Sequence, residues 1–156
     1  MAEKTNAARK LTAMKIPFAE HIYEGDGTLT GQQVAALLGE DEGLVFKTLV
    51  TTGKSAKHYV FVVPVGAELD LKKAASAVGE KSIEMLKAKE LLPLTGYIHG
   101  GCSPIGMKKQ FDTVIHSSVS SLEKMFCSGG RIGYQIELSP ADLYKAVPYK
   151  TADIIK

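Results

Sequence analysis

The chain has 156 residues, 45% of them hydrophobic, and a net charge of +2, which indicates one globular domain over residues 1–156 and excludes a polybasic nucleic-acid-binding protein. Two cysteines, Cys102 and Cys127, are too few for the disulfide framework of a small secreted domain. Residues 1–15 lack the apolar core of a signal peptide, and no stretch approaches the roughly 20 apolar residues that span a bilayer. We therefore expect a cytoplasmic protein with no membrane association.

The first half of the chain alternates helix and strand patterns separated by turn residues. Thr5 and Thr30 are placed to cap helices, and Gly39 is placed to end the second of them. Two strands joined by the polar turn 53–57 are expected to pair antiparallel. The predicted elements are a helix over 6–14, a strand over 18–23, a helix over 31–38, and strands over 44–50 and 59–63.

The second half mixes shorter elements. Asp70 caps a helix that Gly79 ends, Pro93 closes a short helix, and Ser139 with Pro140 begins the last one. The predicted elements are helices over 70–78, 88–92, 120–126 and 139–147, and strands over 81–85, 97–99, 111–116 and 133–138. Because helices and strands do not follow strict βαβ order, we predict an α/β fold of the α+β type, with a mixed, largely antiparallel sheet and flanking helices.

The most informative segment is the predicted strand 44–50, which carries Lys47 in its middle. Val45, Lys47 and Leu49 fall on one face of that strand. A buried ammonium group is costly unless an anionic or polar group meets it. Lys47 therefore either extends into solvent from an edge strand or points into a pocket for a charged or polarised ligand, and the strand pattern leaves both interpretations open.

Two glycine-rich segments could present backbone N–H groups to a ligand. In Gly100–Gly106, glycines permit close approach to the main chain, and Pro104 would make the loop rigid. This segment fits neither a Walker loop nor the dinucleotide-binding fingerprint. Residues 128–133 are a second candidate, a glycine-rich turn with Arg131 before the last predicted strand. A purely structural turn is the alternative for both segments.

Other candidate catalytic groups are few. The histidines His21, His58, His99 and His116 are scattered without metal-ligand spacing, so we expect neither a metal nor another cofactor. Cys102 lies in the glycine-rich loop and is a candidate nucleophile, although no histidine partner is evident from the sequence.

Five segments of the chain carry a resemblance to a known family. They are 45–50 around Lys47, 69–73, 95–109 with the glycine-rich loop, 128–131 and 136–143. In order, spacing and total length the chain resembles the YbaK/EbsC family, whose members are free-standing relatives of the editing domain of bacterial prolyl-tRNA synthetases. The resemblance runs over nearly the whole chain and implies a compact mixed α/β fold whose curved, mostly antiparallel sheet forms a pocket.

The same resemblance implies a set of site residues. It places the essential lysine of the family at Lys47 and the GxxxP loop of the family at Gly100–Pro104. The implied catalytic residues are Lys47, Gly100 and Gly101, and the implied substrate-binding residues are Tyr23, Thr30, Gly31, Cys102, Ser103, Pro104, Ser128, Gly129, Gly130 and Gln135. The chain departs from the family pattern at three places. The family usually has an aromatic residue where Thr30 stands, an acidic residue where Gln135 stands, and Lys-Arg-Gly where residues 131–133 are Arg-Ile-Gly.

The activity that the resemblance implies is removal of cysteine from Cys-tRNA(Pro), and also from Cys-tRNA(Cys), with prolyl-tRNA synthetase as a partner and no cofactor. The cysteinyl thiol would attack its own ester carbonyl and leave as a cyclic thiolactone, so the protein would need no nucleophile of its own. Three alternatives stay open: a hydrolytic Ala-tRNA(Pro) deacylase, a non-catalytic tRNA- or synthetase-binding module, and a lysine Schiff-base enzyme.

Overall fold

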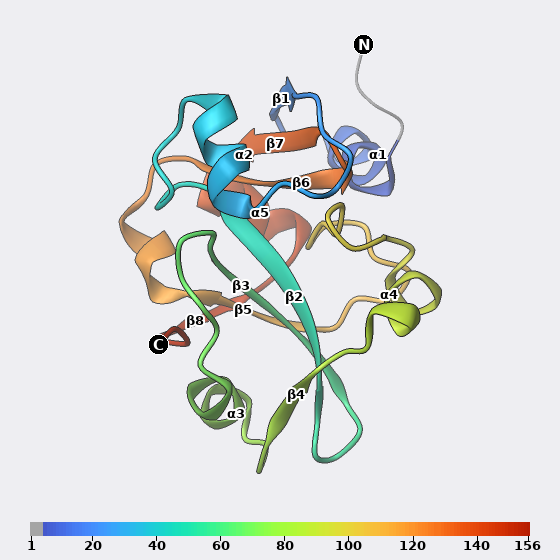
Figure 1. The fold of residues 1–156 in the computed structure, drawn as a ribbon, viewed down its shortest axis with the longest axis vertical. Helices are drawn as coiled ribbons and strands as arrows, with labels where there is room; N and C mark the ends of the chain where they lie inside the picture. The colour runs from blue at the N-terminus through green and yellow to red at the C-terminus, as the bar shows by residue number, and fades with distance from the viewer. Residues whose placement is uncertain (1–4) are drawn as a thin grey trace.

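The computed structural model describes residues 5–156, whose strands form two sheets with helices packed around them (Figure 1). The helices are α1 (Asn6–Ala13), α2 (Gly31–Leu38), α3 (Leu71–Val78), α4 (Ala88–Thr95), a 3₁₀ helix (Ser117–Ser121) and α5 (Pro140–Ala146). The strands are β1 (Ala19–Ile22), β2 (Phe46–Gly53), β3 (His58–Pro64), β4 (Ile83–Met85), β5 (Asp112–His116), β6 (Met125–Arg131), β7 (Tyr134–Leu138) and β8 (Lys150–Ala152).

The strands are divided between a three-stranded sheet, in the order β1-β7-β6, and a five-stranded sheet, in the order β4-β2-β3-β5-β8. The β3–β5 and β5–β8 pairs are parallel, whereas β1–β7, β6–β7, β2–β3 and β2–β4 are antiparallel. The predicted α/β class, the largely antiparallel pairing and the β2–β3 hairpin are therefore confirmed. The division into two sheets and the short strand β8 were not predicted.

The two sheets meet at the start of β2. Val45, just before this strand, forms an isolated parallel bridge with Phe126 of β6, and the Phe126 N–H donates to the Leu44 carbonyl at 2.8 Å. Both Val45 and Phe126 are buried, so apolar packing holds the two strands together at this point. Beyond the bridge β2 runs away from β6 and β7, so the two sheets diverge from this point (Figure 1).

Local capping signals account for the predicted helix boundaries. Thr30 accepts a hydrogen bond from the Gln33 N–H at 3.1 Å, and the Gln33 side chain accepts one from the Thr30 N–H at 2.8 Å, which makes a capping box. Gly39 ends α2 in the left-handed region, with φ of 69°. The caps at the starts of the other helices predicted to be capped are Thr5, Asp70 and Ser139.

Two predicted elements are wrong. Residues 97–99 do not form a strand, because Tyr97 is buried in a loop where its hydroxyl donates to the Ile105 carbonyl at 2.5 Å. Residues 120–126 do not form a helix; they end the 3₁₀ helix and enter β6. Met125 and Phe126 pack into different hydrophobic clusters, which suits the alternation of a strand, and this packing overrides the helical pattern.

Strand β6 also continues through glycines that were predicted to form a turn. The pairing of β6 with β7 shifts register between Ser128 and Arg131, and Gly130 has φ of 107°. Glycine inside a strand is typical of a β-bulge, and a bulge adds a residue without ending the strand. The predicted turn over 128–133 is therefore confined to Ile132 and Gly133.

Helix α4 does not stop before Pro93 as predicted. Proline removes one backbone hydrogen bond and strains the preceding turn, but α4 ends only two residues later, at Thr95. The Thr95 hydroxyl donates to the Leu91 carbonyl at 2.8 Å, and Gly96 caps the helix in the left-handed region. These local contacts allow the helix to include proline in its last turn.

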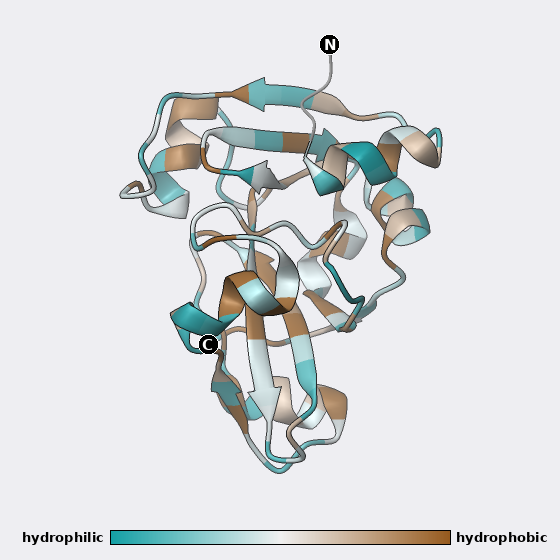
Figure 2. Ribbon diagram, turned by 90° about the vertical axis from the view of Figure 1, so that its right-hand side faces the viewer, coloured by the Kyte–Doolittle hydropathy of each residue, from teal (hydrophilic) through white to brown (hydrophobic). Residues whose placement is uncertain are grey.

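Apolar residues fill both faces of the five-stranded sheet. Val60 and Val62 of β3 belong to the larger hydrophobic cluster, which reaches the three-stranded sheet and α1, whereas Phe61 and Val63 belong to a cluster under α3. Figure 2 shows hydrophobic residues concentrated along the central strands. Within residues 5–156, the helices are too short and too polar for any of them to cross a membrane.

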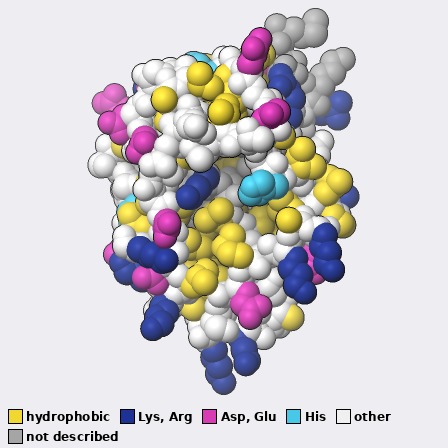
Figure 3. All heavy atoms as spheres, in the orientation of Figure 1, with side chains coloured by type: hydrophobic (Ala, Val, Ile, Leu, Met, Phe, Trp, Pro, Cys, Tyr) yellow, Lys and Arg dark blue, Asp and Glu magenta, His cyan; other side chains and the backbone are white. Residues whose placement is uncertain are grey.

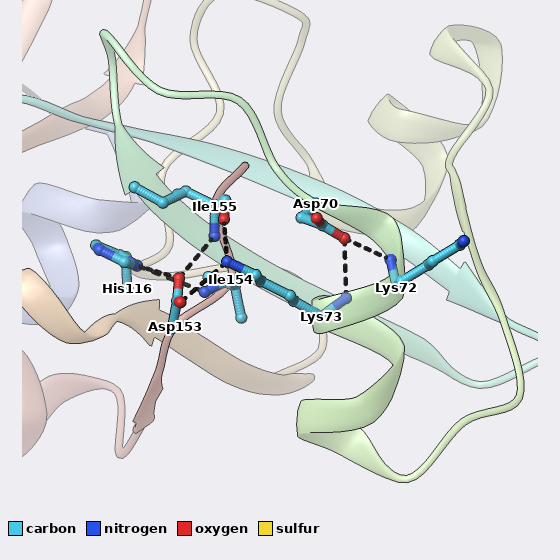
Figure 4. A network of polar contacts seen from close by, with 7 residues as sticks. All are labelled: Asp70, Lys72, Lys73, His116, Asp153, Ile154 and Ile155. Atoms are coloured by element: carbon cyan, nitrogen blue, oxygen red, sulfur yellow. Dashed lines mark hydrogen bonds and ion pairs between the residues drawn. The ribbon is translucent and has the colours of Figure 1, made fainter.

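The segment after β8 returns to α3. Lys73 Nζ donates to Asp153 Oδ2 at 3.0 Å and to the Ile155 carbonyl at 2.8 Å (Figure 4). The hydrogen bond from Lys73 lowers the pKa of Asp153, and His116 Nδ1 lies 3.9 Å from the second oxygen of the same carboxylate. These contacts hold Ile154, which is fully buried, over the cluster beneath α3.

Candidate active site

A cleft of about 480 Å³ lies between the two diverging sheets. Its walls come from the ends of β1 and β4, the starts of α2 and α4, strand β2, the glycine-rich loop and the β6–β7 pair. Most lining side chains are apolar: they include Val34, Val45, Leu49, Val65, Leu86, Leu91 and Ile132. Figure 3 shows hydrophobic side chains gathered in the hollow of this face, with basic and histidine side chains at its rim.

Lys47 lies on β2, opposite Val63 of β3. Among residues 5–156 it is the only lysine that lines the cleft. Its side chain is partly exposed, and within the described residues it has no ion-pair or hydrogen-bond partner. Apolar walls reduce the screening of a charge, so the ammonium group interacts more strongly with a ligand here than it would in open water. The cleft wall thus carries a cation available to an anionic or polar ligand.

The edge of β2 is open beside Lys47. On this edge the Leu44 carbonyl accepts from Phe126 in β6, and the Val50 carbonyl accepts from Leu86 at 3.0 Å. Successive residues of a strand direct their backbone N–H and C=O groups to alternate edges, so Thr48 shares this edge with Leu44 and Val50. Its backbone polar groups therefore face the cleft between the two strand contacts.

The glycine-rich loop contributes alternate residues to the cleft. Gly100 and Cys102 line it, and within residues 5–156 the backbone N–H groups of both have no hydrogen-bond partner. Gly101 does not line the cleft, and its N–H donates to the Ile98 carbonyl at 3.0 Å. Gly100 has φ of 87°, a conformation that favours glycine and turns the chain at this point. The loop can therefore offer donors from Gly100 and Cys102.

The three-stranded sheet supplies the opposite wall. Gln135 of β7 pairs with His21 of β1 on one side and with Ser128 of β6 on the other, so the three side chains share one face. Gln135 and Ser128 line the cleft. Gln135 Oε1 is buried and has no partner in residues 5–156, and the same is true of Thr48 Oγ1 in β2.

The structure brings together eight of the residues implied by the family resemblance. The residues that line the cleft are Tyr23, Thr30, Gly31, Lys47, Gly100, Cys102, Ser128 and Gln135. The residues that do not line it are Gly101, Ser103, Pro104, Gly129 and Gly130. For this second group the structure shows packing and backbone contacts instead of exposure to the cleft.

Residues of the second group contribute to the packing of the loop and strand that carry them. A Cβ atom on Gly101 would lie 2.9 Å from the backbone of Arg131, so glycine lets the loop approach the β6–β7 turn. Ser103 is fully buried, and its hydroxyl accepts from the Ile105 N–H at 3.2 Å. The Gly129 carbonyl accepts from the Thr5 hydroxyl, which ties β6 to the start of α1.

Sequence reasoning missed Thr48 and His99, which both line the cleft. Thr48 follows Lys47 directly, but alternation along a strand placed it on the other face and so concealed its position at the open edge. His99 precedes the glycine-rich loop, and that proximity was the available signal. The position of Thr48, in contrast, can be recognised only from the path of β2 along the cleft.

Cys102 is expected to be unreactive in the folded protein. Burial raises the pKa of its thiol to about 12, and burial does the same for Cys127. The thiolate, which is the nucleophilic form, is therefore scarce at neutral pH. We expect iodoacetamide to label neither cysteine at pH 7.5 in native protein, with labelling increasing as the pH approaches 12. Both should react in urea at pH 7.5; rapid labelling of native Cys102 would contradict the prediction.

Comparison with known proteins identifies the family. The family model of the aminoacyl-tRNA editing domain matches residues 26–146. EbsC of Enterococcus faecalis, named as a candidate Cys-tRNA(Pro)/Cys-tRNA(Cys) deacylase, is 43% identical over 153 residues, which cover 97% of this chain and 93% of EbsC. A proline–tRNA ligase of Shouchella clausii is 27% identical over 124 residues, which cover 78% of this chain and 21% of the ligase.

A solved structure agrees with these matches at the level of the fold. The crystal structure of a candidate trans-editing enzyme for prolyl-tRNA synthetase superposes with a TM-score of 0.82 and 23% identity, covering 99% of both chains. The match to the family model spans the cleft residues from Gly27 to Gln135, and the identity to EbsC extends over nearly the whole chain. The chain therefore belongs to the aminoacyl-tRNA editing domain family, together with EbsC.

Proposed function

We propose that this protein is a trans-editing aminoacyl-tRNA deacylase that removes cysteine from Cys-tRNA(Pro), and also from Cys-tRNA(Cys). The observation that carries the proposal is the unpaired ammonium group of Lys47 in the wall of an apolar cleft. The same cleft is lined by Gly100 and Cys102, whose backbone N–H groups are free within residues 5–156. Family membership and the name of EbsC support the reaction class and the substrate.

The proposed reaction uses the thiol of the substrate. The cysteinyl sulfur attacks the ester carbonyl carbon, a C–S bond forms, and the C–O bond to the terminal ribose breaks. The proton of the thiol ends on the ribose oxygen, so the products are a cyclic thiolactone and uncharged tRNA, with no further reactant. The protein supplies proximity, which can lower the barrier greatly when it holds the two reacting groups together.

Lys47 and the glycine-rich loop have separate roles in this proposal. Lys47 binds the phosphate or ribose oxygens of the terminal adenosine and so places the ester in the cleft. The N–H groups of Gly100 and Cys102 donate to the carbonyl oxygen as negative charge develops on it. One such donor is typically worth about 2.7–4 kcal/mol of barrier. Alanine cannot follow this route because it has no thiol, whereas a pocket alone separates such small side chains poorly.

Prolyl-tRNA synthetase is the proposed partner. A net charge of +2 gives only weak electrostatic attraction to tRNA. A second protein that holds the tRNA would therefore increase the rate at which the deacylase meets its substrate. The similarity to part of a proline–tRNA ligase supports this choice. We expect added synthetase to increase the rate of deacylation of Cys-tRNA(Pro). Tight binding of proline tRNA by the purified protein alone, at physiological salt, would contradict the need for a partner.

The test is deacylation of Cys-tRNA(Pro), Cys-tRNA(Cys) and Ala-tRNA(Pro), each with and without prolyl-tRNA synthetase. Cys-tRNA(Pro) with a methylated thiol is a second control, since it keeps the sulfur atom, adds one methyl group and loses the nucleophile. We expect both cysteinyl esters to be cleaved and the alanyl and methylated esters to be stable. Cleavage of the alanyl or methylated ester would contradict the cyclisation mechanism and indicate hydrolysis. If no ester is cleaved, the assignment as a deacylase is overturned.

A further inference from the structure

An unpartnered buried polar atom belongs to one wall of the cleft. In residues 5–156, three buried side-chain oxygen atoms have no hydrogen-bond partner: Thr48 Oγ1, Ser118 Oγ and Gln135 Oε1. Two of the three, those of Thr48 and Gln135, belong to residues that line the cleft. The Thr48 side chain lies on the face of β2 that carries Phe46 and Val50 into the larger hydrophobic cluster, so its hydroxyl does not bear on the ligand. Gln135 Oε1 is different, because its residue faces the cleft. A buried polar atom without a partner costs stability, so the position of Gln135 Oε1 indicates that a ligand provides the partner.

Gln135 is held in a fixed position. It lies in the central strand of the three-stranded sheet, between His21 and Ser128, and is 7% exposed. Its neighbour on the same face, Glu137, is already engaged, because His21 Nε2 lies 2.8 Å from Glu137 Oε1. Among the side chains of this wall that line the cleft, the amide oxygen of Gln135 is the buried acceptor without a partner in residues 5–156.

An amide oxygen accepts hydrogen bonds, so the matching ligand group must be a donor. A cysteinyl ester of a ribose carries three donors: the α-amino group, the thiol and the remaining ribose hydroxyl. The thiol is a weak donor and must reach the carbonyl carbon in the proposed reaction. The ribose hydroxyl belongs to the nucleoside, which the proposed function places at Lys47. Of the two donors on the aminoacyl group itself, the α-amino group is the strong one.

We infer that Gln135 and the open edge of β2 at Thr48 form a subsite for the free α-amino group of the aminoacyl ester. Gln135 Oε1 accepts one N–H bond from the amine, and the backbone carbonyl of Thr48 provides a second acceptor on the facing wall. This inference rests on the proposed function, because it names the part of the substrate that this end of the cleft recognises.

The subsite has a consequence for the choice of substrate. An amine within an amide bond keeps one N–H and has no charge, so it cannot donate to both acceptors of the subsite. The protein should therefore discriminate against N-acylated aminoacyl esters, a class that includes peptidyl-tRNA, even when the cysteinyl thiol and ester are intact. Recognition of the free amine would thus protect growing chains from deacylation.

The test compares two substrates and two variants in the complete protein. Mercaptopropionyl-tRNA(Pro) is the cysteinyl ester without its amine, and Gln135→Met removes the acceptor at similar volume. We expect wild type to favour Cys-tRNA(Pro) by about 10- to 100-fold in kcat/KM, as for loss of one charge-assisted hydrogen bond. Gln135→Met should lose that preference by slowing only the cysteinyl substrate, and Gln135→Glu, which keeps an acceptor, should retain it.

Other outcomes separate the possible failures. If Gln135→Met lowers kcat/KM equally on both substrates, Gln135 has a structural role and the subsite is overturned. Efficient cleavage of N-acetyl-Cys-tRNA(Pro) by wild type would also overturn the subsite. If wild type cleaves no cysteinyl ester, the proposed function fails instead. In that case binding of an amide-linked cysteinyl-adenosine and its amine-free counterpart still tests the subsite, since only wild type should prefer the compound with the amine.

Discussion

Replacement of Lys47 by alanine is expected to lower kcat/KM for Cys-tRNA(Pro) by about 100- to 1,000-fold, in line with the loss of one strong electrostatic contact in a site of low dielectric. The fold should persist, because within residues 5–156 the ammonium group has no partner that its removal would leave unpaired. We expect the free energy of unfolding to change by less than about 1 kcal/mol, since only packing of the lysine stem is lost. Deacylation kinetics and urea unfolding measure the two effects.

Two further lysine variants serve as controls. Lys47→Arg keeps the positive charge but changes its shape and donor geometry, so it should recover part of the activity. Lys145→Ala removes an exposed lysine of α5 that pairs with Asp142 at 3.2 Å, and it should leave deacylation unchanged. Full activity in a folded Lys47→Ala protein would remove Lys47 from the mechanism.

Replacement of Gly129 by alanine is expected to destabilise the protein by about 1–3 kcal/mol, the usual cost of overpacking a core. A Cβ atom at this position would overlap the ring of Tyr134. That ring cannot move aside easily, because Tyr134 is fully buried and its hydroxyl donates to Glu20 Oε2 at 2.8 Å. For a chain of this size the melting temperature should fall by roughly 3–10 °C, which calorimetry can measure.

The same variant separates two roles for Gly129. If the glycine serves only the packing of β6 on β7, the folded fraction should bind substrate with an unchanged KM. If it contacts substrate, KM should increase without loss of stability. Gly43→Ala is the matched control, since Gly43 has no left-handed backbone and an added Cβ atom would lie 3.1 Å from Oδ1 of Asp41, which is an exposed side chain. A melting temperature for Gly129→Ala equal to that of the control would contradict the packing role.

Local signals were sufficient for much of the fold. The boundaries of α2 followed from Thr30 and Gly39, because a capping box and a left-handed glycine act within a few residues of the chain. The β2–β3 hairpin followed from two alternating apolar runs and a polar turn, which also involve only neighbouring residues. In both cases the chemistry that forms the element is contained in the segment that forms it.

Strand β6 was not predicted correctly, because its conformation depends on residues far away in the chain. Gly129 and Gly130 suggest a turn when taken alone, but pairing with β7 and the hydrogen bond to Thr5 keep them in a bulged strand. The division into two sheets has a similar origin. It depends on the bridge between Val45 and Phe126, which no local pattern of either segment contains.

The sequence by itself determined the family, the fold class, and the pairing of a strand lysine with a glycine-rich loop as candidate site elements. It could do so because five segments over nearly the whole chain carry the resemblance to the family, and because Lys47 and Gly100–Pro104 are unusual within their own segments. Only the tertiary structure decided which residues share the cleft. Gln135 and Thr48 lie 87 positions apart, as their numbers show, and become opposite walls because the two sheets join at one point and then diverge. Burial and unpaired hydrogen-bonding groups are properties of that arrangement, and they arise only when distant strands pack together.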